Sequence, residues 1–202
     1  DLRPHIILLD GKLGEAGMVV ELGEASACAS ERHLFGEHAL GPERRFAYEE
    51  GIRSPFLVRY PPRVGAGTRR HELVICQDIA PTLLTLAGGR PGPQIQGRSL
   101  LPLFAAGARR TRTGWRRSIL CEYWAEQAMP WLVGMSYKAV RTDRYKYIHW
   151  VNRGRTSELD ELYDLDADPY ELDNRNRSTA LASVRAKLRR ELRSLVAEAL
   201  GL

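Results

Sequence analysis

The stretch that decides the fold is Lys138-Ala139-Val140-Arg141-Thr142-Asp143-Arg144-Tyr145-Lys146-Tyr147-Ile148. The runs 137–141 and 145–150 are rich in aromatic and β-branched residues, and the polar triplet Thr142-Asp143-Arg144 separates them. Strand formers on both sides of a short polar turn are typical of two antiparallel strands joined by a tight connection. We therefore expect a strand pair here.

The segments around this strand pair extend the same architecture. Further short strands are predicted at 118–123 and 162–165, and the tail 180–200 repeats apolar residues at helical spacing. Those apolar residues are Leu181, Val184, Leu188, Leu192, Leu195 and Val196. The last part of the chain is therefore expected to be a small antiparallel sheet covered by a terminal helix, an α+β arrangement.

The middle of the chain predicts a strand and a helix. Residues 55–60 form a short apolar run that Pro61-Pro62 ends, as expected of a buried strand. Asp78 is expected to cap a helix through its side chain, with Ala80, Leu83, Leu84 and Leu86 facing inward, and Gly88-Gly89 to end it. The basic stretch 107–113 is the best candidate for a subdomain boundary.

Composition sets limits on the function. The net charge is +5, carried almost wholly by arginine, and the arginines are scattered along the sequence. Because no nucleic-acid-binding motif accompanies this charge, we expect no nucleic-acid partner. No apolar run approaches the length of a membrane span. The three cysteines, Cys28, Cys76 and Cys121, are odd in number and far apart, which argues against a disulfide framework and a structural zinc site.

Six segments in the range 34–176 resemble elements of the sulfatase family, in the family's order. They are GEHAL at 36–40, AYEEGIRSP at 47–55, DIAPTLL at 78–84, QGRSL at 96–100, KAVRTDRYKYI at 138–148 and ELYDLDADPYE at 161–171. The chain thus resembles the C-terminal portion of sulfatases of the alkaline-phosphatase-like superfamily. The resemblance implies an α/β fold, in which 34–110 is the later part of the catalytic-domain sheet and 111–202 a small α+β antiparallel subdomain with a terminal helix.

The same resemblance implies the hydrolysis of a sulfate ester in a sulfated small molecule or carbohydrate. The family's nucleophile is a formylglycine made from a Cys or Ser in a CxPSR or SxPSR element, and calcium and basic side chains neutralise the developing charge. No such element is present, and the family's SDNG or SDHG calcium element should fall at 29–32, which reads ASER. We therefore expect no catalytic nucleophile, no metal ligands, no bound metal and an inactive chain by itself.

Two residues are candidates for substrate binding by the same resemblance. The family's sulfate-binding lysine lies four residues before the Tyr of YEE, where this chain has Arg44, and a guanidinium can hold an oxyanion through two parallel donors. His38 lies in the GEHAL segment and can reach a substrate or orient a ligand. A solvated charged loop for Arg44 and a packing role for His38 remain open.

Other positions and functions also keep two interpretations. Lys138, Arg141 and Lys146 either line the rim of a cleft for an anionic substrate or form the solvent face of an antiparallel sheet. The alternatives to a sulfatase are a phosphodiesterase or phosphonate hydrolase of the same superfamily, and a catalytically inactive remnant. Residues 1–33 are poorly specified apart from strand-like runs at 6–9 and 18–20, and we expect them to be translated from a shifted reading frame.

Overall fold

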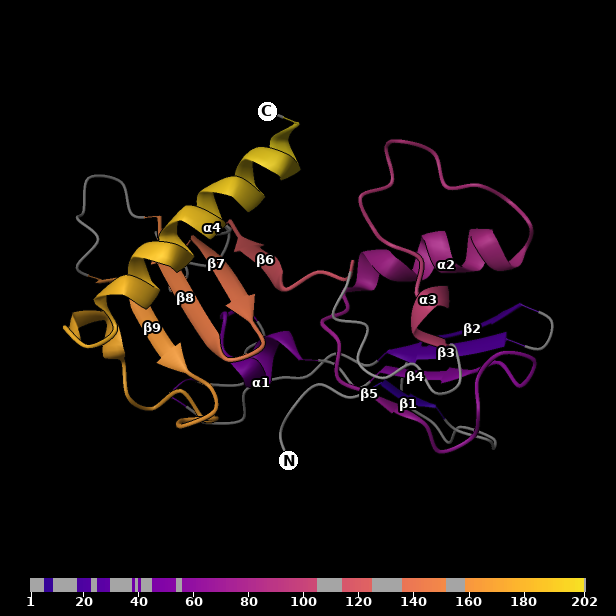
Figure 1. Cartoon of the computed structure of the whole chain (residues 1–202), viewed down its shortest axis with the longest axis horizontal. Helices are drawn as coiled ribbons and strands as arrows, with labels where there is room; N and C mark the ends of the chain where they lie inside the picture. Colours follow the sequence, from indigo (N-terminus) through magenta and orange to yellow (C-terminus); the bar gives the residue numbers. More distant parts are fainter. Residues whose placement is uncertain are drawn as a thin grey trace. The chain divides into compact units, whose positions relative to one another are not determined.

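The computed structural model describes residues 6–8, 18–22, 25–29, 38, 40, 45–53, 56–104, 114–124, 136–151 and 159–201. The chain divides into two compact units (Figure 1). The first unit comprises 1–31 and 53–116, and the second comprises 32–52 and 117–202. The segment 32–52 therefore belongs with the C-terminal sheet, although it precedes that sheet by many residues.

The first unit contains a mixed sheet in the order β2-β3-β4-β1-β5. Strand β1 (Ile6–Leu8) runs parallel to β4 (Phe56–Arg59), and the other neighbours pair antiparallel. The remaining strands are β2 (Met18–Leu22), β3 (Ala25–Ala29) and β5 (Arg69–Arg70). The strands predicted at 6–9, 18–20 and 55–60 are confirmed, whereas β3 was not predicted, because its small residues show no hydrophobic alternation.

The core of the first unit lies where β4 packs on helix α3 (Leu101–Phe104). Phe56 and Val58 from the strand contact Leu100, Leu103 and Phe104 from the helical segment. The unit also contains the 3₁₀ turn η2 (Cys76–Asp78) and helix α2 (Ile79–Leu86). Gly88, two residues after the helix, has a left-handed backbone conformation.

The helix predicted after Asp78 is confirmed, but its inward face is different from the predicted one. Pro81 and Thr82 are buried, whereas Ala80 is exposed and Leu84 is 41% exposed. Thr82 is buried because its hydroxyl donates to the Asp78 carbonyl and accepts from the Leu100 N–H. A hydrogen-bonded hydroxyl thus determines the buried face, which apolar spacing alone misses.

The Asp78 carboxylate organises the loops of the first unit and does not cap α2. It is fully buried and accepts from the backbone N–H groups of Ile75 at 2.9 Å and Arg98 at 2.8 Å. Both carboxylate oxygens also bond the Arg116 guanidinium. A buried carboxylate is stable only when it is paired and hydrogen-bonded in this way. The DIAPTLL and QGRSL segments are therefore joined through one side chain.

The second unit contains a four-stranded antiparallel sheet in the order β6-β7-β8-β9. Its strands are β6 (Ser118–Tyr123), β7 (Tyr137–Thr142), β8 (Tyr145–Trp150) and β9 (Glu161–Asp164). The 3₁₀ turn η5 (Arg175–Arg177) leads to helix α4 (Ala182–Leu200), and the short helix α1 (Glu49–Ile52) comes from the earlier segment. The predicted antiparallel sheet with a terminal helix is confirmed.

Both faces of this sheet are covered. Helix α4 lies along one face (Figure 1), where Leu188 and Leu192 pack on Val140, Tyr147 and Leu162. All six apolar positions predicted for the helix belong to this cluster. On the other face Ala47 packs against side chains from three strands, namely Tyr137, Ala139, Ile148 and Tyr163. The sheet thus has no open solvent face at its centre, and the segment containing Tyr48 and Glu49 is part of the fold.

Candidate functional site

The described candidate for substrate binding, His38, lies against the AYEE segment. Its imidazole stacks on the Tyr48 ring with the centroids 3.9 Å apart, and its Nε2 lies 3.7 Å from Oε2 of Glu50. That separation is too long for a hydrogen bond. Both atoms are buried, and neither has a hydrogen-bond partner among the described residues. His38 also has a φ of 55°, a left-handed conformation that is uncommon outside glycine.

Arg44, the other candidate for substrate binding, lies outside the described residues. The chain on its C-terminal side is well fixed, because Phe46 and Ala47 are buried and Tyr48 stacks on His38. Tyr48 is held in turn by Glu161, to which its hydroxyl donates at 3.4 Å. Burial and the Glu161 carboxylate raise the pKa of Tyr48, so the phenol stays protonated.

Glu161 also forms hydrogen bonds with two other aromatic residues near Tyr48. Its carboxylate accepts from Trp150 Nε1 at 2.9 Å and from the Tyr163 hydroxyl at 2.7 Å. The aromatic ring that supports His38 is therefore hydrogen-bonded to Glu161 on strand β9, which lies 113 residues further along the chain.

A buried cluster of four charged residues joins the AYEE segment to the C-terminal sheet. Glu49 on α1 contacts Arg141 Nη2 at 3.2 Å and Lys146 Nζ at 2.8 Å. Lys146 also bonds Glu171 at 2.7 Å and donates to the Ala47 carbonyl at 2.8 Å. The Glu49 backbone N–H donates to Glu171 at 2.6 Å. We call Glu49, Arg141, Lys146 and Glu171 the charge cluster.

The two carboxylates of the charge cluster have opposite pKa shifts. Burial alone raises the pKa of Glu49, but Lys146 and Arg141 outweigh it and bring the pKa to about 2. Burial also raises the pKa of Glu171. Lys146 lowers it only in part, since the negative Glu49 lies nearby, and the pKa of Glu171 is about 7. Glu49 is thus firmly ionised, whereas Glu171 exchanges its proton near neutral pH.

The charge cluster corrects two interpretations of the basic residues on β7 and β8. Arg141 is 6% exposed and Lys146 is fully buried. These two residues therefore line no cleft rim and form no solvent face. Lys138 pairs instead with Glu122 at 3.2 Å. One signal for the cluster was present in the sequence: Arg141 and Lys146 are direct partners across the strand pair, and like charges opposite one another require anions between them.

The residues of this chain do not fit the calcium site that the family resemblance implies. Among the described residues, no three His, Cys, Asp or Glu side chains gather in a way that could hold a metal ion. The sequence at 29–32 supplies one carboxylate beside an arginine, whereas calcium prefers several oxygen ligands. The helices in the described ranges include none long and apolar enough to cross a membrane.

Comparison with known proteins identifies the family. The family described as N-sulphoglucosamine sulphohydrolase, C-terminal, matches residues 36–198. An N-acetylglucosamine-6-O-sulfatase of Bacteroides thetaiotaomicron is 35% identical over 143 residues, which are 70% of this chain and 24% of that protein. An arylsulfatase of Volvox carteri is 31% identical over 188 residues, covering 83% of this chain and 28% of that protein. The chain thus spans about a quarter of the length of these relatives.

Solved structures share the fold. The structure of BT4656 in complex with its substrate D-glucosamine-2-N,6-O-disulfate superimposes with a TM-score of 0.75 at 30% identity, covering 83% of this chain and 33% of that one. A phosphonate monoester hydrolase of Agrobacterium radiobacter gives a TM-score of 0.68 at 26% identity, covering 84% and 34%. The family match over most of the chain shows that this chain belongs to the sulfatase family and corresponds to the family's C-terminal part.

Proposed function

We propose that this chain forms the C-terminal, substrate-contacting part of a sulfuric ester hydrolase that acts on a sulfated carbohydrate. The observation that carries the proposal is the family match over residues 36–198. A relative named as an N-acetylglucosamine-6-O-sulfatase and a structure bound to a disulfated glucosamine support an amino sugar sulfate as the substrate class.

His38 and Glu50 bind a hydroxyl group of the sugar in this proposal. Their facing atoms are 3.7 Å apart, buried, and without hydrogen-bond partners among the described residues. Leaving buried polar atoms unpaired costs about 1–3 kcal/mol each, so the pair favours a ligand that satisfies both. One hydroxyl oxygen can lie about 2.8 Å from each atom, donating to the carboxylate and accepting from the imidazole.

Arg44 binds the sulfate group in this proposal. It lies four positions before Tyr48, whose position is fixed by Glu161 and by the stack with His38. A guanidinium can donate two parallel hydrogen bonds to the oxygens of one sulfate group. The chain alone contains neither the formylglycine element nor the calcium element, so we expect it to bind the substrate without hydrolysing it.

The test is a chimera in which this chain replaces the corresponding C-terminal part of the Bacteroides N-acetylglucosamine-6-O-sulfatase. We expect the chimera to hydrolyse glucosamine 6-sulfate, and Arg44→Ala and His38→Ala each to lower kcat/KM by roughly tenfold or more, because each removes a charge-assisted or buried hydrogen bond. The control Arg63→Ala removes an exposed arginine of the first unit and should leave kcat/KM unchanged.

One alternative has an observation in its favour, the likeness to a phosphonate monoester hydrolase. The chimera separates the two functions, because a phosphonate monoester and a sulfate monoester can be supplied to the same protein. A folded chimera, judged by cooperative melting, that hydrolyses the phosphonate ester and not the sulfate ester would replace our proposal with the alternative.

A further inference from the structure

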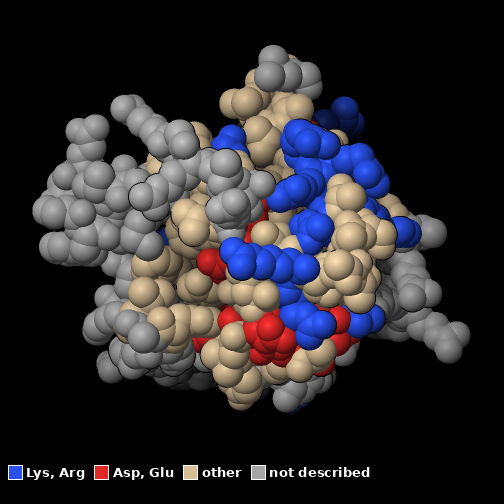
Figure 2. Space-filling view, turned by 90° about the vertical axis from the view of Figure 1, so that its left-hand side faces the viewer, with Lys and Arg blue, Asp and Glu red and all other residues tan. Residues whose placement is uncertain are grey.

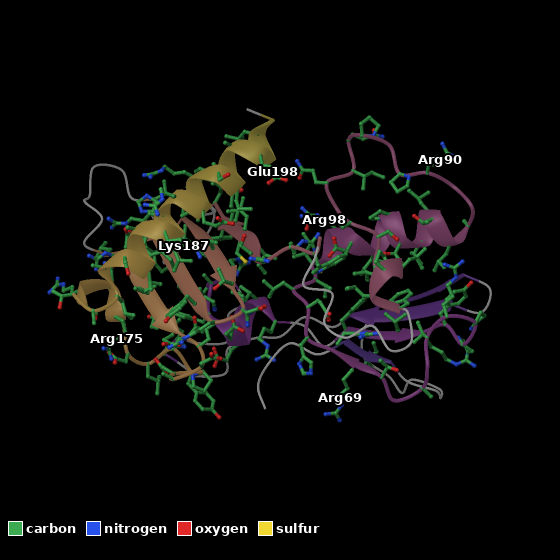
Figure 3. All side chains as sticks on the ribbon, in the orientation of Figure 1. Arg69, Arg90, Arg98, Arg175, Lys187 and Glu198 are labelled. Carbon is green, nitrogen blue, oxygen red and sulfur yellow. The ribbon has the colours of Figure 1, made fainter. Side chains whose placement is uncertain are left out.

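The outer face of helix α4 carries a concentrated positive charge. Its first twelve residues, 182–193, hold five basic residues against the single acidic Glu191, and η5 just before the helix adds Arg175 and Arg177. Figure 3 shows Lys187 on α4 and Arg175 beyond the end at which the helix begins. In Figure 2 the basic side chains gather over this unit, with most acidic side chains below them. The fold thus concentrates arginines that are scattered in the sequence.

Only part of this charge has a structural use. Arg185 donates to the Asn176 carbonyl, and Arg189 bonds the Tyr147 hydroxyl and the Asp160 carboxylate. The remaining basic residues of the segment, apart from Arg175, make no ion pair or hydrogen bond with any part of the chain that the structure describes. They are Arg177, Lys187, Arg190 and Arg193, and all four are exposed. We call these four residues the basic face.

The placement of these charges works against the helix. The N-terminal end of a helix favours anions and its C-terminal end favours cations, but α4 has no acidic residue in its first turn and no basic residue in its last. Lys187, Arg190 and Arg193 also follow one another at a spacing of three, where like charges repel. Helix stability therefore does not explain the arrangement, which favours an anionic partner outside the fold.

We propose that the basic face binds a sulfated polysaccharide, so that the substrate is a polymer held at a second point away from the reacting sulfate ester. This inference rests on the proposed function. Arginine, which supplies three of the four residues, matches sulfate oxygens with two parallel donors. Lys187, Arg190 and Arg193 extend about 9 Å along the helix, which suits a chain carrying repeated sulfate groups.

Two other anionic partners fit this surface less well. Single-stranded nucleic acids are held by aromatic side chains that stack on the bases, and α4 contains no aromatic residue. Membrane-surface helices place an apolar face in the lipid, whereas the apolar face of α4 is buried against β7 and β8. The basic face offers positive charge, but α4 has neither aromatic side chains for stacking nor an exposed apolar face. These properties favour a flexible sulfated polymer as the partner.

The experiment measures the affinity of the full chain for heparin, as a sulfated polysaccharide, at several salt concentrations. We expect the triple variant Lys187→Gln/Arg190→Gln/Arg193→Gln to raise Kd by roughly tenfold and to make the salt dependence shallower by about two to three counterions. Glutamine is a good helix former, and a melting curve checks that α4 stays folded. The control Arg63→Gln/Arg69→Gln/Arg90→Gln removes the same charge from the first unit, where Figure 3 labels Arg69 and Arg90, and should leave Kd within about twofold.

Three results would overturn the inference. The first is an equal loss of affinity in both triple variants, which indicates attraction by net charge alone. The second is heparin binding by the α4 variant that matches the unsubstituted chain. The third is tighter binding of duplex DNA, or of a carboxylated polysaccharide such as alginate, than of heparin. The assay needs no hydrolysis, so its outcome is independent of the chimera's activity on a monosaccharide sulfate.

Discussion

Replacing Lys146 with methionine removes the cation at the centre of the charge cluster. Lys146 is fully buried, and its Nζ lies within 2.8 Å of Glu49, Glu171 and the Ala47 carbonyl. Methionine fills much of the same volume but removes one donor from two buried carboxylates and one carbonyl, and among the described residues it leaves Glu171 only the Glu49 backbone N–H as a donor. Removing one partner of a buried ion pair costs about 3–5 kcal/mol, a large part of the total stability of a typical domain.

The loss of stability in Lys146→Met should depend on pH. Lys146 lowers the pKa of Glu171, so its removal raises that pKa above the wild-type value of about 7. The loss should therefore be smaller at pH 6, where Glu171 is mostly protonated with or without Lys146, than at pH 8, where only the unsubstituted chain stabilises the ionised Glu171 through Lys146. Arg141 continues to neutralise Glu49 at both pH values.

Urea unfolding followed by circular dichroism measures the change, and hydrogen exchange of peptides from 137–150 assigns it to the second unit. Lys138→Met is the matched control, because it makes the same chemical change on the neighbouring strand β7, where Lys138 forms a partly exposed pair with Glu122. We expect this control to shift the free energy of unfolding by no more than about 0.5 kcal/mol. Equal midpoints for Lys146→Met and Lys138→Met would refute the reasoning.

Three further predictions concern other residues. Glu171→Gln should flatten the pH dependence of stability between 4.5 and 7, because the raised pKa of Glu171 makes the wild-type stability fall as pH rises through that window; urea titrations across pH 4–8 check this, and an unchanged profile would contradict it. Gly97→Ala should destabilise the first unit by about 1–3 kcal/mol, because an added Cβ would lie 1.9 Å from the Gln77 carbonyl oxygen; a melting temperature equal to that of the unsubstituted chain would rule this out. If 1–33 come from a shifted frame, another frame of the gene should encode an apolar strand followed by Asp-Asn-Gly or Asp-His-Gly, and sequencing that finds neither favours a diverged chain.

The sequence predicts the second unit well because its elements carry strong periodic signals. The apolar positions of α4 recur at helical spacing, and the strands on either side of Thr142-Asp143-Arg144 are rich in residues that favour strands. The turn itself is local: the Thr142 hydroxyl accepts from the Tyr145 N–H and donates to its carbonyl. Such features depend on near neighbours in sequence, so they can be predicted from sequence.

The charge cluster could not be predicted in the same way. Glu49 lies 92 residues before Arg141 in the sequence, and only the folded chain brings them together. Lys146 therefore resembled a surface lysine on a strand until its partners were known. The prediction of the buried face of α2 was wrong for a related reason. Thr82 is buried because it forms hydrogen bonds to Asp78 and Leu100. Polar contacts decide both positions, from Glu49 to Arg141 and from Thr82 to Asp78 and Leu100, and apolar periodicity carries no information about them.

We propose that these 202 residues supply structure and substrate contacts but not the chemistry of sulfate ester hydrolysis. The most direct test incubates the purified chain with a chromogenic aryl sulfate, with and without added calcium. We predict no turnover above the buffer rate in either case, because the sequence contains neither the formylglycine element nor the calcium element. Turnover that persists after repurification would contradict the claim.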